Sequence, residues 1–218
     1  MGVMIEGTYH ADDPSPDTTL GGTFERTKST IRDWITPVGP FAPDLGRYHL
    51  YAAWNCPWAH RVLLTRVVLG LETAISVSYA KPRRTSDGWV FDDSGAFSDP
   101  ELGARALHEV YARQTPPYTG RITVPILWDR KTGQIVSNES ADLVRMLGAF
   151  GGPDITPSAH MAEIDRWNDL IYRTLNNGVY RAGFARTQAA YDAGVAEVFE
   201  TLDKLNDHLA THDWLVGN

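Results

Sequence analysis

A single stretch decides the fold of this chain: YAAWNCPWAHR, residues 51–61, which contains the only cysteine of the 218 residues, Cys56. An apolar run, residues 48–53, leads into this cysteine and predicts a strand. A helical pattern begins at Pro57, where proline is tolerated because the first N–H groups of a helix have no partner anyway. Cys56 is therefore expected between a strand and a helix N-terminus. The unpaired N–H groups and the positive end of the helix dipole would favour its thiolate there.

We interpret Cys56 as a reactive cysteine. The alternative is a buried structural cysteine, because free cysteines are among the most buried residues. Three positions further on, at Ala59, a dithiol oxidoreductase would carry its second cysteine. Because the sequence has no other cysteine, a redox-active Cys56 has to form a mixed disulfide with a thiol from outside the chain. The sequence therefore favours monothiol chemistry.

Composition excludes several classes of function. A hydrophobic fraction of 43% in 218 residues suffices for one large domain or two small ones. The net charge of −7 argues against nucleic-acid binding, which needs a basic surface. No apolar run approaches the roughly 20 residues of a membrane span, and residues 1–20 lack the apolar region of a signal peptide. A single cysteine and no export signal indicate a reducing, cytoplasmic location. The histidines are scattered, with only His60 near Cys56, so we expect no metal site.

The first part of the chain predicts an arm followed by a βαβ unit. Residues 1–46 are punctuated by proline and glycine, which is typical of an extended, irregular arm. Residues 47–53 predict a strand, residues 57–70 a helix closed by Gly70, and residues 74–79 a second strand. Strands joined in this way run parallel.

A long polar segment follows, about 80–121, with a short helical piece near 102–112. Loops of this length are uncommon in compact domains and are usually functional. Trp89, inside the segment, is either a local hydrophobic anchor or a wall of a binding site.

Two more strands and a helix complete this half. Residues 122–128 predict a strand that contains Val124-Pro125, and a proline there requires an edge, a bulge or a cis bond. Residues 134–137 form the second strand of a hairpin. Glu139 and Ser140 then open a helix. Such residues are usually helix caps, although helix starts also bind carboxylates.

The β-α-β, β-β-α order predicts a thioredoxin-like α/β domain over residues 47–148. A linker, 149–158, leads to an all-helical domain that begins at 159 and continues to 218. Its first long helix is interrupted at 176–178. The last predicted helix has an apolar face at helical spacing, made of Tyr191, Val195, Val198, Leu202, Leu205 and Leu209.

A thioredoxin-like half followed by a helical half resembles a cytosolic glutathione transferase. Four separated motifs, residues 55–61, 88–91, 138–140 and 176–185, resemble the glutathionyl-hydroquinone reductases, also called Xi-class glutathione transferases. The resemblance runs from about residue 21 to the end. Family members continue through further helices, so the helical domain is expected to be incomplete here.

The resemblance implies the chemistry and the partners. Cys56 would take glutathione from a glutathionyl-hydroquinone as a mixed disulfide, and a second glutathione would release it as oxidised glutathione. Glutathione is then a co-substrate, no metal takes part, and the enzyme is a homodimer. Tyr180 would face the quinone ring and hydrogen-bond its oxygen, although a plain packing tyrosine is the alternative.

The resemblance also implies how glutathione is held. The backbone of Val124, with a cis Pro125, would pair with the cysteinyl part like one more strand. Glu139 would take the γ-glutamyl ammonium and Ser140 its carboxylate. Trp89 would lie against the tripeptide.

Three rival functions remain open on sequence. A conjugating glutathione transferase would carry serine or tyrosine at the cysteine turn. An omega-like thiol transferase or dehydroascorbate reductase shares the monothiol cysteine but would lack the element at 88–91. A binding module without turnover predicts a Cys56 of ordinary reactivity that forms no glutathione adduct.

Overall fold

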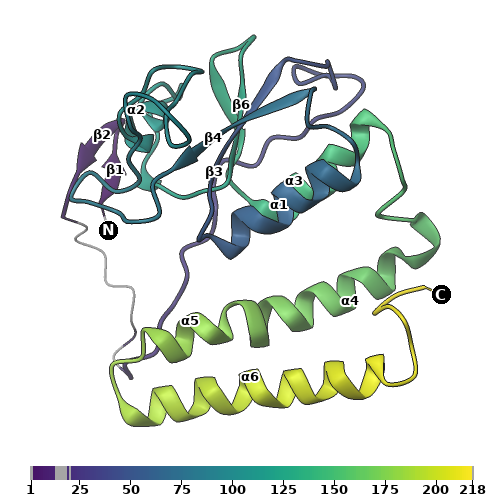
Figure 1. Cartoon of the computed structure of the whole chain (residues 1–218). Coiled ribbons are helices and arrows are strands. Elements are labelled where there is room, and N and C mark those ends of the chain that lie inside the picture. Colours follow the sequence, from purple (N-terminus) through teal and green to yellow (C-terminus); the bar gives the residue numbers. More distant parts are fainter. Residues whose placement is uncertain (1, 13–18, 20, 218) are drawn as a thin grey trace. The chain divides into compact units, whose positions relative to one another are not determined.

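The structure is a computed structural model that describes residues 2–12, 19 and 21–217. Its contacts form two compact units, shown in Figure 1. The first unit comprises Met1–Pro14 and Ser29–Ile155, and the second comprises Ser15–Lys28 and Thr156–Asn218. The predicted arm, 1–46, therefore contributes to both units.

The first unit is built on a four-stranded sheet with the order β4-β3-β6-β7. Its strands are β3 (Tyr48–Ala53), β4 (Ile75–Ala80), β6 (Ile126–Asp129) and β7 (Gln134–Ser137). β3 and β4 run parallel, as predicted, whereas β6 is antiparallel to both β3 and β7. Every residue of β3 is buried, which is typical of a strand covered on both faces.

Helices cover both faces of this sheet. α1 (Pro57–Val68) and α3 (Ser140–Met146) lie side by side on one face (Figure 1), where Val62 and Leu143 pack in one apolar cluster. α2 (Leu107–Tyr111) contributes to a second cluster, which also contains Cys56. Side chains alternate along the strands, so Leu127 joins the first cluster and its neighbours Ile126 and Trp128 join the second. A 3₁₀ turn, Leu147–Phe150, follows α3.

The prediction of an irregular N-terminal arm is wrong for its first residues. β1 (Val3–Ile5) and β2 (Thr8–His10) form an antiparallel hairpin, and β1 also pairs with β5 (Gly120–Arg121). Met4, in the middle strand, is fully buried. Strands of two or three residues are too short for side-chain alternation to reveal them in a sequence.

The strand expected over 122–128 begins only at Ile126. The Val124–Pro125 peptide bond is cis, one of the three arrangements that the sequence left open, and the proline precedes the strand instead of lying within it. Proline has no N–H to donate, so the ladder of hydrogen bonds starts after it.

The long segment after β4 is anchored by a buried carboxylate, Asp99. It accepts hydrogen bonds from the Ser78 hydroxyl at 2.9 Å and from Tyr51 at 3.3 Å, which tie it to β4 and β3. It also accepts the backbone N–H groups of residues 101, 102 and 104. This segment is therefore fixed to the sheet, although its sequence is polar.

Buried His49, on β3, links stability to pH. Its ring nitrogens lie 2.7 Å from the Ser76 hydroxyl and 2.9 Å from the Ser78 hydroxyl. Burial lowers the pKa of His49 to about 4, although Glu101 and Asp99 act to raise it. The ring is therefore neutral near pH 7, and its 3.5 Å contact with Glu101 is not an ion pair there.

In the unfolded chain the same histidine has a pKa of about 6.5. Between these two pKa values the unfolded chain binds a proton that the folded chain does not, so stability falls as the pH falls through this window. As the pH falls through this window, the wild type is expected to lose up to about 3 kcal/mol of its free energy of unfolding through His49. His49→Gln should remove this loss, which urea unfolding at several pH values across the window measures. An unchanged slope in the variant would show that other groups cause it.

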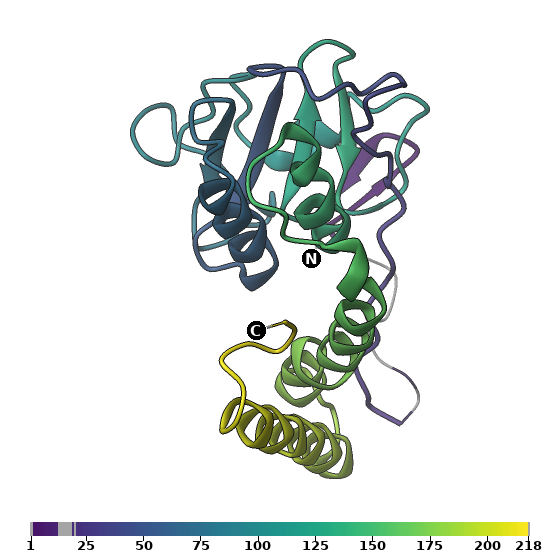
Figure 2. The same cartoon turned by 90° about the vertical axis from the view of Figure 1, so that its right-hand side faces the viewer.

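The second unit is helical. It contains a short 3₁₀ turn (Ser158–His160), α4 (Met161–Ile171), a π-helical turn (Tyr172–Asn176), α5 (Gly178–Gly183) and α6 (Gln188–Leu209). Figures 1 and 2 show α6 running alongside the other two helices. Within the described ranges, no helix is both long and apolar enough to cross a bilayer.

The apolar face predicted for α6 is wrong in part. Tyr191, Leu202 and Leu209 are 41–48% exposed, whereas the buried residues are Gly194, Val198 and Thr201. The reason is close packing: a Cβ at Gly194 would lie 2.9 Å from the backbone nitrogen of Ala182 on α5. Small side chains therefore line this contact, and several large ones point elsewhere.

Candidate active site

Cys56 occupies the turn at which the sequence placed it. It is the residue that caps α1, with extended backbone angles (φ −100°, ψ 110°). Its N–H donates to the Ala53 carbonyl at the end of β3, and its carbonyl accepts the N–H of His60. The side chain is 8% exposed. The backbone of both elements therefore fixes where the thiol lies.

The thiol of Cys56 contacts the chain segment that carries the cis proline. Its Sγ lies 3.4 Å from the carbonyl oxygen of Val124 and donates to it. Val124 is itself buried and directly precedes cis Pro125. Cys56 and Val124 are 68 positions apart in sequence, and their contact brings the thiol to the Val124–Pro125 segment, so that three predicted site residues lie together.

Trp89 is anchored in the same apolar cluster as Cys56 and Val124. The side chain is 9% exposed, and its carbonyl accepts the N–H of Leu107 at the start of α2. The guanidinium of Arg84 lies 5.2 Å from the ring centroid. The side chain of Trp89 is therefore packed as a hydrophobic anchor. Its contact with a bound tripeptide stays a prediction.

Glu139 and Ser140 begin α3, as predicted. Glu139 is the capping residue, and its Oε1 accepts the N–H of Ala141 at 3.0 Å. Its side chain keeps 18% of its surface exposed. Ser140 is almost completely buried. The capping role and a ligand role are compatible for Glu139, because one carboxylate offers several acceptor positions.

Arg61, for which the sequence patterns predict no role, makes several of the polar contacts here. It projects from α1 to α3, where its Nε and Nη2 donate to the Ser140 hydroxyl oxygen at 3.1 and 2.6 Å. Its Nη2 also lies 3.7 Å from Oε1 of Glu139. Its place five residues after Cys56 was visible, but sequence does not show that α3 begins beside it.

A second arginine, Arg32, also contacts α3. Arg32 forms a bidentate pair with Asp142, with nitrogen–oxygen distances of 2.6 and 2.7 Å. The N–H of Asn138 donates to the Ile31 carbonyl in the same segment. The start of α3 is thus fixed by the later part of the predicted arm.

Tyr180 belongs to the second unit, on α5. The guanidinium carbon of Arg26 lies 4.3 Å from its ring centroid, and the rings of Phe24 and Phe184 are 6.1 and 6.0 Å away. Arg26 in turn donates to the side-chain oxygen of Asn177 at 2.7 Å. This cation–π contact restrains the orientation of the tyrosine ring. The assignment of Tyr180 to the quinone stays a prediction.

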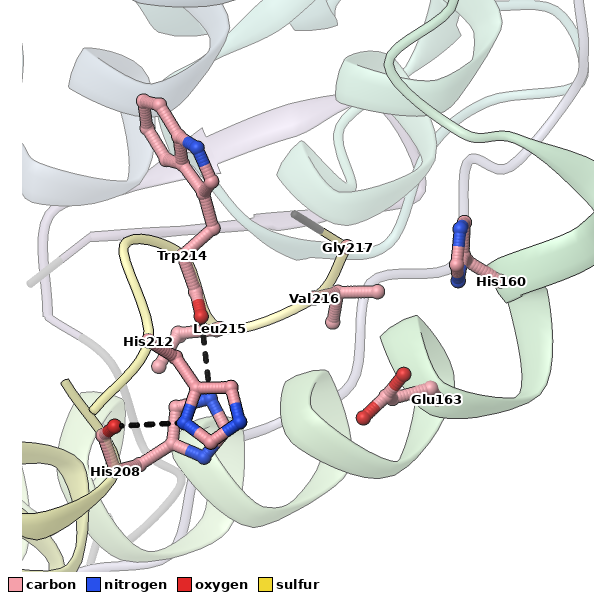
Figure 3. A pocket seen from close by; sticks show the side chains of 8 residues that line it. All are labelled: His160, Glu163, His208, His212, Trp214, Leu215, Val216 and Gly217. Atoms are coloured by element: carbon pink, nitrogen blue, oxygen red, sulfur yellow. Dashed lines mark hydrogen bonds between the residues drawn. The ribbon is translucent and has the colours of Figure 1, made fainter.

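A separate cavity of about 450 Å³ lies in the second unit (Figure 3). Its polar lining includes Glu163 and His160, together with His208 and His212, whose rings stack at 4.3 Å. His208 is hydrogen-bonded to the carbonyl of Trp214, and His212 to that of His208. None of the predicted site residues lines it. Over the described part of the chain, no group of three or more histidine, cysteine, aspartate or glutamate side chains could hold a metal ion.

Comparison with known proteins gives the family. Residues 55–149 match the model of the glutathione S-transferase N-terminal domain. The whole chain is 46% identical to glutathionyl-hydroquinone reductase YqjG of Escherichia coli and 44% identical to glutathionyl-hydroquinone reductase PcpF of Sphingobium chlorophenolicum. In each case it covers 71% of the relative.

The solved glutathione-bound structure of YqjG, a glutathione transferase homologue from Escherichia coli, superimposes with a TM-score of 0.82 at 46% identity. The match covers 86% of this chain and 66% of that one. The cysteine turn, the cis proline and the start of α3 described above lie within the matched domain. The chain therefore belongs to the glutathionyl-hydroquinone reductase family of glutathione transferases.

Proposed function

We propose that this protein is a glutathione-dependent reductase that removes glutathione from glutathionyl-hydroquinones. The observation that carries the proposal is the place of Cys56, the chain's one cysteine, at the start of α1 with its thiol on the Val124 carbonyl. Relatives at 44–46% identity over the whole chain carry the name of this activity.

In the first step the Cys56 thiolate attacks the glutathione sulfur of the substrate in its keto form. A sulfur–sulfur bond forms while the carbon–sulfur bond breaks. The electron pair of that bond passes through the ring carbon to the adjacent carbonyl oxygen, which takes a proton, so that the ring becomes the aromatic hydroquinone. The ring is thereby reduced and Cys56 is oxidised to a mixed disulfide with glutathione.

In the second step the thiolate of a free glutathione attacks the glutathionyl sulfur of this mixed disulfide. Oxidised glutathione leaves, and Cys56 returns as a thiolate. One glutathionyl-hydroquinone and one glutathione thus give one hydroquinone and one oxidised glutathione. A chain with a single cysteine can complete this cycle, because no second protein thiol is needed.

The first unit supplies groups suited to the glutathionyl moiety. The backbone at Val124, beside the thiol, would pair with the cysteinyl part, as an added strand does. The partly exposed carboxylate of Glu139 would take the γ-glutamyl ammonium, and Ser140 would donate to the carboxylate. Trp89 would lie along the tripeptide and Tyr180 against the quinone ring.

The test is turnover of a glutathionyl-hydroquinone with added glutathione, following both products. We expect hydroquinone and oxidised glutathione to appear in equal amounts. Without free glutathione, the reaction should stop after one turnover, and intact mass should show one glutathionyl group on Cys56. No release by folded protein would exclude the reductase function.

Dehydroascorbate and a mixed disulfide of glutathione with a small thiol serve as comparison substrates. An omega-like thiol transferase would turn these over faster than the hydroquinone conjugate. A protein that reduces none of the three and forms no adduct would act as a binding module.

We further propose that the protein is a homodimer that acts in the cytoplasm. The family resemblance supports the dimer, and light scattering after size-exclusion chromatography tests it. The second step consumes reduced glutathione, which supports a compartment where glutathione is kept reduced.

A further inference from the structure

We propose that Arg61 is a positioning residue that makes the γ-glutamyl end of the site selective for a free α-carboxylate. The inference rests on the proposed function, because it concerns how the glutathionyl moiety of the same substrate is recognised. Arg61 would act through Ser140, whose hydroxyl it orients.

The geometry at Ser140 carries the inference. Two nitrogens of one guanidinium, Nε and Nη2 of Arg61, donate to the same hydroxyl oxygen at 3.1 and 2.6 Å. A serine hydroxyl has two acceptor lone pairs and one O–H to donate, whereas arginine has donors only. Arg61 therefore uses the acceptor capacity of Ser140 and leaves the hydroxyl to act as a donor.

A hydroxyl fixed as a donor discriminates between ligands. It can hydrogen-bond a carboxylate, which only accepts, and it has no lone pair left for an ammonium or an amide N–H. Beside it, the guanidinium adds a positive charge that arginine keeps at every physiological pH. The hydrogen-bond donor on Ser140 and the positive charge on Arg61 therefore both favour an anion at this point.

Two further contacts hold the guanidinium in place. It lies 5.2 Å from the ring centroid of Trp58, one turn earlier on α1, and 3.7 Å from Oε1 of Glu139. Glu139 is the group proposed to take the ammonium of the same γ-glutamyl end. The side chain of Arg61 thus extends from α1, the helix that Cys56 caps, to Glu139 and Ser140, the two polar groups of this subsite.

Arg66, on the same helix, provides the contrast and the control. Its Nε and Nη2 donate to backbone carbonyls, those of Ile75 and Glu72, at 2.6 and 2.7 Å. Arg66 therefore supports the fold only. An arginine with a purely structural role on α1 would resemble it.

The experiment compares three hydroquinone conjugates, with ordinary glutathione as the second substrate throughout. One conjugate carries glutathione, one carries a tripeptide without the α-carboxylate, and one carries a tripeptide without the α-ammonium. For Arg61→Met we expect kcat/KM to fall by about tenfold or more with the first and third conjugates and to change little with the second. Arg61→Lys, which keeps the charge, should fall in between.

Ser140→Ala tests the route of the effect. If Arg61 acts through the Ser140 hydroxyl, adding Arg61→Met to Ser140→Ala should cost much less than Arg61→Met alone. Arg66→Met should leave the order of preference among the three conjugates as in the wild type, whatever it does to the melting temperature.

The outcomes separate this inference from the proposed function. A wild type that releases no hydroquinone from any conjugate would overturn both. A wild type that turns over, with an Arg61→Met variant equally impaired on all three conjugates, would leave the reductase intact and reduce Arg61 to a structural role. If Arg61→Met does not fold, the comparison of the three conjugates is made with Arg61→Lys.

Discussion

Cys56→Ser is expected to abolish the release of hydroquinone from a glutathionyl-hydroquinone, with a fall in rate on the order of 10⁴-fold or more. A hydroxyl cannot form the mixed disulfide on which both steps depend. The chain has no other cysteine that could take over. The measurement is the rate of hydroquinone release under saturating glutathione, together with the intact mass of the protein after incubation with substrate alone.

Serine is the right replacement because it leaves the surroundings unchanged. Its hydroxyl can donate to the Val124 carbonyl as the thiol does, at a position that is 8% exposed. Melting temperature and glutathione affinity should therefore stay near those of the wild type. A variant that kept a substantial rate would mean that glutathione is removed without a covalent step at Cys56.

The largest effect on stability is expected at the Arg47–Asp129 pair. Arg47 donates to Asp129 through Nε at 2.6 Å and Nη2 at 2.7 Å, and Asp129 is fully buried at the end of β6. Nη2 also donates to the Pro40 carbonyl, which ties the incoming segment to the sheet. Arg47→Met leaves a buried carboxylate without its partner, so we expect a loss of about 3–5 kcal/mol in urea unfolding.

An exposed pair provides the control. Arg173 and Asp169 on the helical unit lie 3.3 Å apart with both side chains more than half exposed. Arg173→Met should change stability by less than about 1 kcal/mol. Equal effects of the two substitutions would show that the Arg47 pair is no stronger than one at the surface.

Acid should weaken the same pair. Burial by itself would raise the pKa of Asp129, but hydrogen bonds from Arg47, Thr132 and the N–H of Lys131 outweigh it, so the pKa is lowered. In the unfolded chain an aspartate titrates near pH 3.9. The stabilisation is therefore present above about pH 4 and lost as the pH falls below it, a dependence that Asp129→Asn should lack.

The parts of the fold that local sequence determines could be predicted. Strand, cysteine turn and helix follow one another between residues 48 and 68 with the expected signals, Pro57 at the start of the helix and Gly70 after it. The hairpin around Gly133 and the capping of α3 by Glu139 are equally local. Each of these features depends on residues that are close together in the sequence, which is why sequence patterns reveal them.

Features that depend on tertiary contacts could not be predicted. The two bonds from Arg61 to Ser140 join residues 79 positions apart, and no spacing rule relates them. The buried stripe of α6 runs through Gly194, Val198 and Thr201 and follows the close approach of Gly194 to Ala182. Three of the large apolar residues predicted for it are exposed instead. The strand at 3–5 pairs with residues 120–121, far away in the sequence, and the strand at 8–10 pairs with it in turn.

This N-terminal pairing has a practical consequence for how the protein is engineered. Val3 pairs with Arg121, three residues before Val124, and Met4 fills a buried position beside Gly120. A cloning boundary moved past these residues would uncover the backbone that leads directly to the cysteine's hydrogen-bond partner. A purification tag is therefore better separated from Val3 by a spacer than joined to a shortened chain.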